Sequence, residues 1–241
     1  MVGYFCFMQI KDHKLVGVPF KPSPNIGKNK AGVPLNLTPQ YLIQHFDAAA
    51  NATGAISWML SPKSKVSAHL HIDREGNITQ LVAFNRIAHH AGESEWRGLF
   101  GMNSRSIGIE IQNTGSQDYT AKQMDAVAEV SKLLVSYYNL KEVIGHEDVA
   151  PIRKNDPSGT KVNLFDWAGL LIVCGLAPST KATTADLNIR RGQGTQFPVV
   201  TKIPKGDAVF ELNRIGTWSK IQVVGSNQSG WVSNAYLTKA I

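Results

Sequence analysis

The segment Gly145-His-Glu-Asp-Val-Ala-Pro-Ile-Arg-Lys-Asn-Asp-Pro157 brings a histidine, a lysine and an aspartate together in a short stretch. A β-strand would hold His146 and Asp156 about 30 Å apart, because each residue advances the chain by roughly 3.3 Å. Pro151 and Pro157 instead favour a loop that folds back and brings both side chains to one point. We interpret the segment as a loop that builds a site. On these residues alone, a polar surface loop is an equal alternative.

The composition is that of a folded protein with a basic balance. The 241 residues suit a medium domain followed by a small one, or one large domain. Hydrophobic residues make up 43% and charged residues 18%, which is ordinary for a protein with a core. The net charge of +7 favours an anionic partner, such as a cell wall, a membrane surface or nucleic acid. Because the sequence has no arginine-rich run and no nucleic-acid motif, we expect no nucleic-acid partner.

The cysteines and the N-terminus bear on the compartment. Cys6 and Cys174 lie in apolar stretches far apart in the sequence, and neither belongs to a CxxC pair. We therefore expect buried free thiols. The N-terminus has no basic segment followed by a long apolar run, and no stretch is long enough to cross a membrane. These features predict no secretory signal peptide and no membrane insertion.

Residues 1–176 alternate between strand-like and helix-like segments. Thr120 and Gln123 form a capping-box pattern that opens the clearest helix. Gly76 supplies a turn between two strands, and Gly108 inside an apolar strand predicts a bulge or the close approach of another group. The other expected elements are short strands within 1–20, a strand at 41–44, a helix at 53–60, a hairpin at 66–82, strands at 106–112 and 143–144, and a helix at 165–174.

The composition changes after Leu176. Residues 177–184 are small and polar, which predicts a linker. Residues 185–241 hold about five short β-like runs separated by glycines, the pattern of a small barrel. From Lys181 onward there are eight lysines and arginines against three acidic residues, and there is no histidine or cysteine. This tail therefore resembles a binding module more than a catalytic one.

All seven histidines lie in the first domain. A catalytic zinc site uses three protein ligands and leaves one position for water. His45 falls at the end of a predicted core strand, and His146 and Asp156 lie on the loop described above, so these three could form such a site. The sequence has no HExxH motif, and scattered histidines are also common as hydrogen-bonded structural residues.

Several blocks of the first domain match one family in order: 42–45, 66–80, 88–92, 103–110 and 145–157. They are similar to zinc-dependent N-acetylmuramoyl-L-alanine amidases of the type-2 family, which is related to the peptidoglycan recognition proteins. In the tail, the block 187–237 resembles a bacterial SH3 domain, and together the two resemblances cover nearly the whole chain after about residue 35. They imply an α/β domain at 1–176, with a mixed central β-sheet flanked by helices, and a small all-β SH3-like barrel at 185–241.

The amidase resemblance implies a zinc ion held by His45, His146 and Asp156. It also implies that Glu110 is the catalytic carboxylate and that Lys154 is its electropositive partner. The implied reaction is hydrolysis of the amide between N-acetylmuramic acid and the L-alanine of the stem peptide by a zinc-activated water. The residues alone leave two alternatives: Glu110 as a buried strand residue paired with an arginine, and Lys154 as a solvated surface lysine. The alternative function is a non-catalytic peptidoglycan-recognition protein of the same fold.

The resemblance also suggests substrate contacts. His69, His90 and Asn103 fall in matching blocks, although structural hydrogen bonding is an equal alternative for both histidines. The matching positions in the tail suggest a wall-binding groove, although tryptophans in so small a barrel often form its core. Its candidates are Trp218, Trp231 and Tyr236.

These inferences predict peptidoglycan or soluble muropeptides as partners. We expect a protein made in the cytoplasm that acts on the wall in the periplasm or outside the cell. Its release would bypass the general secretion pathway, through phage holin pores as for an endolysin, or through a secretion machine. A cytoplasmic recycling enzyme is a third setting, but a wall-binding module argues against it.

Overall fold

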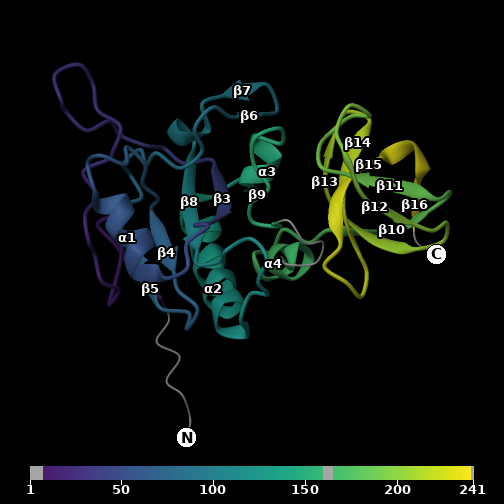
Figure 1. Cartoon of the computed structure of the whole chain (residues 1–241), viewed down its shortest axis with the longest axis horizontal. Helices are drawn as coiled ribbons and strands as arrows, with labels where there is room; N and C mark the ends of the chain where they lie inside the picture. Colours follow the sequence, from purple (N-terminus) through teal and green to yellow (C-terminus); the bar gives the residue numbers. More distant parts are fainter. Residues whose placement is uncertain (1–7, 160–164, 240–241) are drawn as a thin grey trace, which may run out of the picture.

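The first domain is built on a five-stranded mixed sheet (Figure 1). The computed structural model describes residues 8–159 and 165–239. The strand order is β5-β4-β8-β3-β9, in which β5 is antiparallel to β4 and the other neighbours are parallel. The strands are β3 (Tyr41–Phe46), β4 (Leu70–Ile72), β5 (Ile78–Gln80), β8 (Ser106–Ile111) and β9 (Glu142–Gly145).

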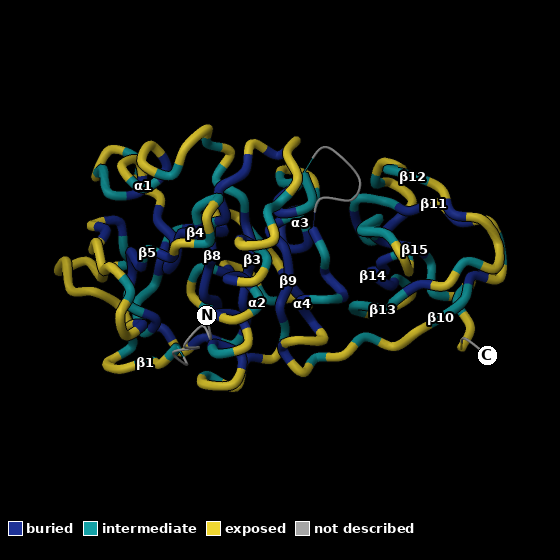
Figure 2. The backbone as a smooth tube through the Cα atoms, turned by 90° about the horizontal axis from the view of Figure 1, so that it is seen from below, coloured by how far each residue is buried: buried dark blue, intermediate teal, exposed yellow. Residues whose placement is uncertain are grey.

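The helices follow the expected pattern. Helix α2 (Ala121–Tyr138) begins at the capping box that Thr120 and Gln123 predicted. It packs with α4 (Trp167–Val173) into the main core against the apolar residues of β4 and β8. Helix α1 (Ala52–Leu60) packs against Ala68 and Leu81 beside the β4–β5 hairpin. Figure 2 shows that the buried segments run along β3, β8 and β9, with the exposed loops around them.

Polar residues are aligned across the other face of the sheet. His45 pairs in register with Glu110 of β8, and Glu110 pairs with His71 of β4. Residues in register on neighbouring strands point to the same side, so these three side chains share one face. His45 and Glu110 lie near the C-terminal ends of parallel strands, the edge where open α/β sheets bind ligands.

The segment 145–157 is not wholly a loop, as the sequence had suggested. It begins with a short helix, α3 (His146–Val149). The Asp148 carboxylate accepts a hydrogen bond of 2.8 Å from the Gly145 N–H, which caps this helix. The chain then returns, and the Glu147 N–H donates to the Asp156 carbonyl at 2.8 Å. This return brings Asp156 back beside His146.

Four short strands and a 3₁₀ helix complete the first domain: β1 (Ile10–Lys11), β2 (Lys14–Leu15), β6 (Glu95–Trp96), β7 (Leu99–Phe100) and Met102–Ser104. None of the helices in the described parts of the chain has the length and hydrophobicity needed to cross a bilayer. Cys174 is buried with a free thiol, as expected, whereas Cys6 lies outside the described residues.

The second domain is an antiparallel sheet with the order β12-β11-β15-β14-β13-β10-β16. The linker expected at 177–184 is wrong, because β10 pairs with both β13 and β16. Only Thr183 of β10 is buried, so this strand has no apolar alternation to signal it. The strands are β10 (Ser179–Thr183), β11 (Leu187–Arg190), β12 (Val199–Ile203), β13 (Ala208–Ile215), β14 (Trp218–Val223), β15 (Ser229–Ser233) and β16 (Leu237–Lys239), with a 3₁₀ helix at Asn234–Tyr236.

The two domains share a core. Trp231 of β15 is 1% exposed and packs against Trp96, with the ring centroids 6.2 Å apart. Its hydrophobic cluster also contains Ile144 and Val149 of the first domain, and Trp218 packs against it. The predicted groove role of Trp231 is therefore wrong, because its ring is buried between the domains. Of the three candidates for the groove, Tyr236 is the most exposed, at 48%.

Candidate active site

The structure brings together His45 from β3, His146 from the start of α3, and Asp156 from the returning chain. The Nδ1 atoms of the two histidines are 2.9 Å apart. Oδ2 of Asp156 lies 3.1 Å from Nδ1 of His45 and 3.0 Å from Nδ1 of His146. All three residues are buried. The fold thus gathers side chains from three places in the chain at one point.

The far side of each imidazole decides which nitrogen carries a proton. Nε2 of His146 lies 3.0 Å from the carbonyl oxygen of Ala91, which only accepts, so this nitrogen is protonated and donates. Nε2 of His90 lies 3.4 Å from the carbonyl oxygen of Ser106 and donates in the same way. Nδ1 of His90 is then free to accept from Nε2 of His45 at 2.9 Å. Both Nδ1 atoms at the centre therefore present lone pairs.

This arrangement fits a metal cation. Two imidazole nitrogens and a carboxylate oxygen converge within 3.1 Å of one another. Burial, and then the neighbouring His146, lower the pKa of His45 to about 4, so its ring is neutral at pH 7 although Asp156 is adjacent. Two histidines and one carboxylate are the ligands of open catalytic metal sites. The cluster can therefore hold a metal ion and leave a coordination position for water.

A glycine makes room for the histidine behind the cluster. A Cβ atom added to Gly108 would lie 2.4 Å from Cγ of His90. This confirms the close approach that a glycine inside β8 predicted. The loop that carries His90 is held by Asn103, whose Oδ1 accepts from the N–H groups of His90 and Ala91 at 2.9 and 2.7 Å. His90 and Asn103 thus orient the metal-ligand candidates from behind.

Two of the predicted substrate contacts, His69 and Asn103, form hydrogen bonds within the fold. Nδ1 of the buried His69 accepts from the Gly108 N–H at 3.0 Å, and its Nε2 donates to the carbonyl of Arg86 at 2.9 Å. Both ring nitrogens are thus used within the fold. Neither His69 nor Asn103 is among the described residues that line the cleft next to the cluster. His71, expected to be only a strand residue, pairs with Asp47 at 2.9 Å.

A cleft of about 390 Å³ opens beside the cluster. Its lining includes His90, His146, Asp156 and Glu110, together with the more exposed Trp58 and Lys154. Sequence reasoning missed Trp58, which is 58% exposed on α1, because an exposed aromatic residue on a short helix has no local signal. The cleft places the metal-ligand candidates, a carboxylate, a lysine and an aromatic side chain along one cavity.

Glu110 carries an unpaired carboxylate. Its Oε2 is buried and has no hydrogen-bond partner among the described residues. Burial, followed by the charges of Asp156 and Asp47, raises the pKa of Glu110 well above 4.5, while Lys154 lowers it. Among the described residues, no arginine pairs with Glu110. For that part of the chain, this excludes the alternative that Glu110 is a structural residue paired with an arginine. A buried carboxyl with a raised pKa in a cleft is a candidate for proton transfer.

Lys154 lies on the wall of the cleft. Its side chain is half-buried and forms no ion pair with any residue that the structure describes. Its charge nevertheless acts on the pKa values of both Glu110 and His45. A free ammonium in this place can stabilise negative charge that develops beside the metal-ligand cluster.

The helix that begins at His146 is braced by the second domain. Nζ of Lys220 in β14 lies 2.6 Å from Oδ2 of Asp148 and 3.2 Å from Oε1 of Glu147. It also lies 4.0 Å from the ring centroid of Trp167. Asp148 thus caps α3 and binds Lys220 through the same carboxylate oxygen. The sequence around Lys220 contains no pattern that predicts its contact with α3.

Comparison with known proteins agrees with this geometry. A family model described as N-acetylmuramoyl-L-alanine amidase matches residues 35–159, which is 125 of the 241 residues. The chain belongs to this amidase family. A second model, described as a bacterial SH3 domain, matches residues 185–238. The amidase match includes every metal-ligand candidate as well as Glu110 and Lys154.

Among curated relatives of the amidase domain is the 1,6-anhydro-N-acetylmuramyl-L-alanine amidase AmpD of Escherichia coli K12. It is 42% identical over 106 residues, which cover 43% of this chain and 56% of AmpD. The N-acetylmuramoyl-L-alanine amidase AmiD of the same strain is 34% identical over 136 residues, 46% of this chain and 48% of AmiD. The chain thus spans about half the length of the curated relatives it matches.

Two solved structures share the amidase fold. A selenomethionine derivative of AmpD aligns with a TM-score of 0.55 and 31% identity over 69% of this chain and 99% of that one. The complex of E. coli AmiD with anhydro-N-acetylmuramic acid-L-Ala-D-γ-Glu-L-Lys aligns with a TM-score of 0.53 and 26% identity over 72% of this chain and 68% of that one.

Proposed function

We propose that this chain hydrolyses the amide bond between N-acetylmuramic acid and the L-alanine of the peptidoglycan stem peptide. One observation carries the proposal: His45, His146 and Asp156 converge at one point, and His146 and Asp156 line the same cleft as Glu110, whose Oε2 is unpaired. A metal-ligand cluster and a proton acceptor in one cleft are the parts that metal-assisted hydrolysis needs.

We infer that the metal is zinc, held by His45, His146 and Asp156. Two imidazoles and one carboxylate suit Zn²⁺, and the far nitrogens of both histidines are fixed by the contacts to His90 and Ala91. Bound zinc would supply a Lewis acid and would lower the pKa of a coordinated water from its bulk value to about 7.

The residues of the chain supply the proton transfers. Glu110 accepts a proton from the attacking water and returns it to the departing amine of L-alanine, a role that its raised pKa supports. Lys154 faces the negative charge that develops on the carbonyl oxygen of the scissile amide. The amide C–N bond breaks, and the products are a lactyl carboxylate and a peptide with a free L-alanine amine.

The substrate class follows from the relatives. AmpD is named for 1,6-anhydro-N-acetylmuramyl-L-alanine, and AmiD was solved with an anhydromuropeptide. We therefore propose anhydromuropeptides and peptidoglycan as substrates here.

The complete set of ligands with Glu110 favours hydrolysis over recognition without catalysis. The basic second domain supports action on the cell wall, in the periplasm or outside the cell, as for a bacteriolytic endolysin. Release through holin pores or a secretion machine stays a prediction.

The test is direct. Zinc-loaded protein is incubated with anhydro-N-acetylmuramic acid-L-Ala-D-γ-Glu-L-Lys and with insoluble peptidoglycan, and the released peptide is identified by mass spectrometry. We expect a peptide with a free L-alanine N-terminus. If folded, zinc-loaded protein binds both materials but releases no peptide, the hydrolase proposal fails and the recognition function replaces it.

A further inference from the structure

A second cavity, of about 270 Å³, lies between the two domains next to the catalytic cleft. One wall comes from the chain around the metal-ligand cluster, and the other comes from β11, β12 and β15 of the second domain. Asn155 lines both this cavity and the catalytic cleft, and it directly precedes Asp156. We call the second cavity the interdomain crevice. The two cavities adjoin at Asn155.

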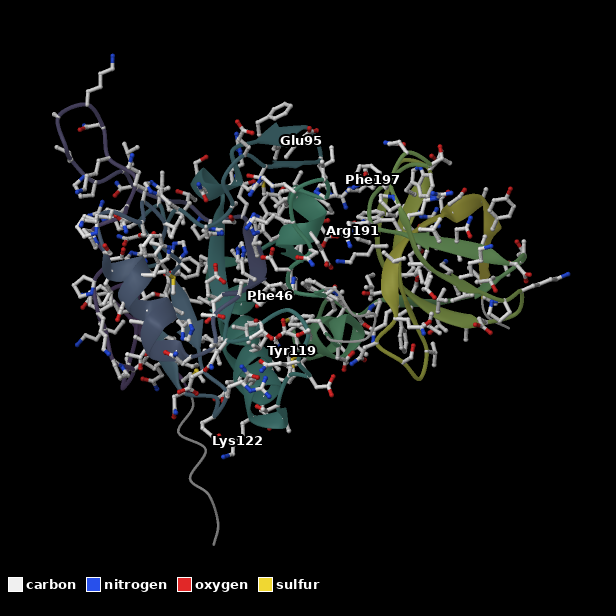
Figure 3. All side chains as sticks on the ribbon, viewed as in Figure 1. Phe46, Glu95, Tyr119, Lys122, Arg191 and Phe197 are labelled. Carbon is white, nitrogen blue, oxygen red and sulfur yellow. The ribbon has the colours of Figure 1, made fainter. Side chains whose placement is uncertain are left out.

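The interdomain crevice holds positive charge that no carboxylate neutralises. The guanidinium of Arg191 is half-buried and makes no hydrogen bond or ion pair with any described residue. Figure 3 shows Arg191 on the side of the second domain that faces the first. The guanidinium of Arg190 donates only to the carbonyls of Thr195 and Phe197, at 3.2 and 2.9 Å. Two guanidinium charges thus lack an acidic partner.

Three other charged groups line the interdomain crevice. Lys220 is paired with both Glu147 and Asp148, which leaves one formal negative charge among the three. With the two guanidinium groups, the charged side chains of its described lining carry a net formal charge of +1. The side-chain amide nitrogen of Asn155 donates no hydrogen bond within residues 8–159 and 165–239. One buried acceptor of the lining is unpaired, Oδ1 of Asp148. The free donors include the Arg191 guanidinium and the Asn155 side-chain amide. This set suits an anion with planar oxygen atoms.

We propose that the interdomain crevice binds a carboxylate of the stem peptide while the amide of the same substrate lies at the metal-ligand cluster. This inference rests on the proposed function and adds the place where the peptide binds. In L-Ala-D-γ-Glu-L-Lys the γ-linkage leaves the α-carboxylate of the glutamate free, and the terminal lysine carries another. The peptide passes over Asn155 and reaches Arg191.

A short peptide can reach the start of the interdomain crevice. An extended tripeptide spans about 10 Å, at roughly 3.3–3.6 Å per residue. Asn155 is the immediate neighbour of the ligand candidate Asp156, so the interdomain crevice begins within the reach of a peptide whose first amide is at the cluster. A cavity of about 270 Å³ between two domains also fits a compact end group better than a long wall polymer, which needs an open surface.

The test pairs one change in the protein with one change in the substrate. Arg191→Gln removes the free charge, and Lys202→Gln removes a charge from an exposed position of β12 that does not line the interdomain crevice. Each zinc-loaded protein is assayed with anhydro-N-acetylmuramic acid-L-Ala-D-γ-Glu-L-Lys and with the same compound whose two peptide carboxylates are carboxamides. Circular dichroism and zinc content show that each variant is folded and loaded.

The expected pattern is specific. Arg191→Gln lowers kcat/KM for the free acid by about 10- to 100-fold, mainly through KM, because a charge-assisted pair to the carboxylate is lost. The carboxamide substrate changes by less than about threefold in the same variant, and Lys202→Gln behaves like the wild type with both substrates. Equal losses with both substrates would overturn the proposal, because a general distortion does not distinguish acid from amide.

A binding measurement separates this inference from the proposed function. Calorimetry with the free tripeptide L-Ala-D-γ-Glu-L-Lys needs no turnover, and we expect Arg191→Gln to weaken its binding by about 10-fold or more. Unchanged tripeptide binding contradicts the proposal even if the enzyme is active. Weaker binding of insoluble peptidoglycan alone would assign Arg191 to an anionic wall polymer instead. Absence of hydrolysis by wild-type protein, with tripeptide binding that depends on Arg191, would reject only the proposed reaction.

Discussion

The ammonium group of Lys220 lies 2.6 Å from Oδ2 of Asp148, two residues after the metal-ligand candidate His146. The same carboxylate oxygen accepts the Gly145 N–H and so caps α3. A side chain of the second domain therefore fixes the helix from which the first domain presents a ligand. The second domain is part of the active-site support as well as a candidate for wall binding.

Replacing Lys220 by methionine should destabilise the protein by about 3–5 kcal/mol, because Asp148 and Glu147 would remain buried without their cation. Urea denaturation followed by circular dichroism measures the change. Lys202→Met is the control, since that lysine is exposed, and we expect its effect to stay within about 0.5 kcal/mol. A loss below about 1 kcal/mol for Lys220→Met would show that the ion pair does not support the fold.

The contribution of Lys220 should depend on pH. Burial lowers its pKa, but Asp148 and Glu147 outweigh burial and hold the pKa above 10.5. A lysine with a raised pKa in the folded state contributes its full stabilisation below 10.5 and loses it as the pH rises through the folded-state pKa. The difference in unfolding free energy between wild type and Lys220→Met should thus be constant from about pH 7 to 10 and shrink above that. A constant difference at higher pH contradicts the assignment.

Gly108→Ala should disturb the ring behind the metal-ligand cluster, because the new Cβ would lie 2.4 Å from Cγ of His90. We expect a loss of about 1–3 kcal/mol in unfolding free energy, together with weaker zinc binding in a chelator competition. The control is the same substitution in a His90→Ala background, where the clash is absent and the loss should be smaller. Equal losses in both backgrounds would mean that His90 is not the group affected.

Glu110→Gln and His146→Ala should separate proton transfer from metal binding. Glu110→Gln should keep stoichiometric zinc and lose at least about 100-fold in kcat, because it removes the proton acceptor. His146→Ala should lose both zinc and activity, since it removes a ligand. Atomic absorption gives the zinc content, and peptide release gives the rate. Wild-type turnover in Glu110→Gln would remove Glu110 from the mechanism.

Trp231→Ala should act on stability, because the ring is buried between the domains. We expect a loss of about 3–5 kcal/mol, whereas Tyr236→Ala, at a position 48% exposed, should cost less than about 1 kcal/mol. Thermal unfolding measures both variants, and sedimentation with insoluble peptidoglycan measures their binding. Full stability in Trp231→Ala, with lost wall binding, would restore the groove role that the sequence suggested.

Local sequence patterns predicted the elements that depend on local interactions. The capping box at Thr120 and the turn at Gly76 have a cause within a few residues, and both are present. Gly108 predicted a close approach, but the residue that approaches, His90, lies 18 positions away and could not be named from the local pattern. Strand β10 was missed because its polar residues show no alternation. Helix α3 was missed because only four residues form it and its cap is a side chain within the same turn.

Contacts between distant parts of the chain could not be derived in this way. His45 and His146 are 101 residues apart, and no periodicity relates them. Their association came from resemblance to a family, and the structure supplies the geometry. Lys220 and Trp231 look like ordinary residues of a small barrel, and their burial against the first domain depends on how two folded units pack. Burial of that kind has no signature in either segment alone.

The far nitrogens of the ligand histidines are fixed by hydrogen bonds that end on main-chain oxygens, at Ala91 directly and at Ser106 through His90. A main-chain oxygen is the same whatever side chain its residue carries. Apart from His90 and the candidate ligands themselves, the side chains that shape the cleft can therefore be exchanged, by selection or by an engineer, without altering which nitrogen of each histidine faces the cluster. Substrate preference and ligand chemistry can be changed independently in this scaffold.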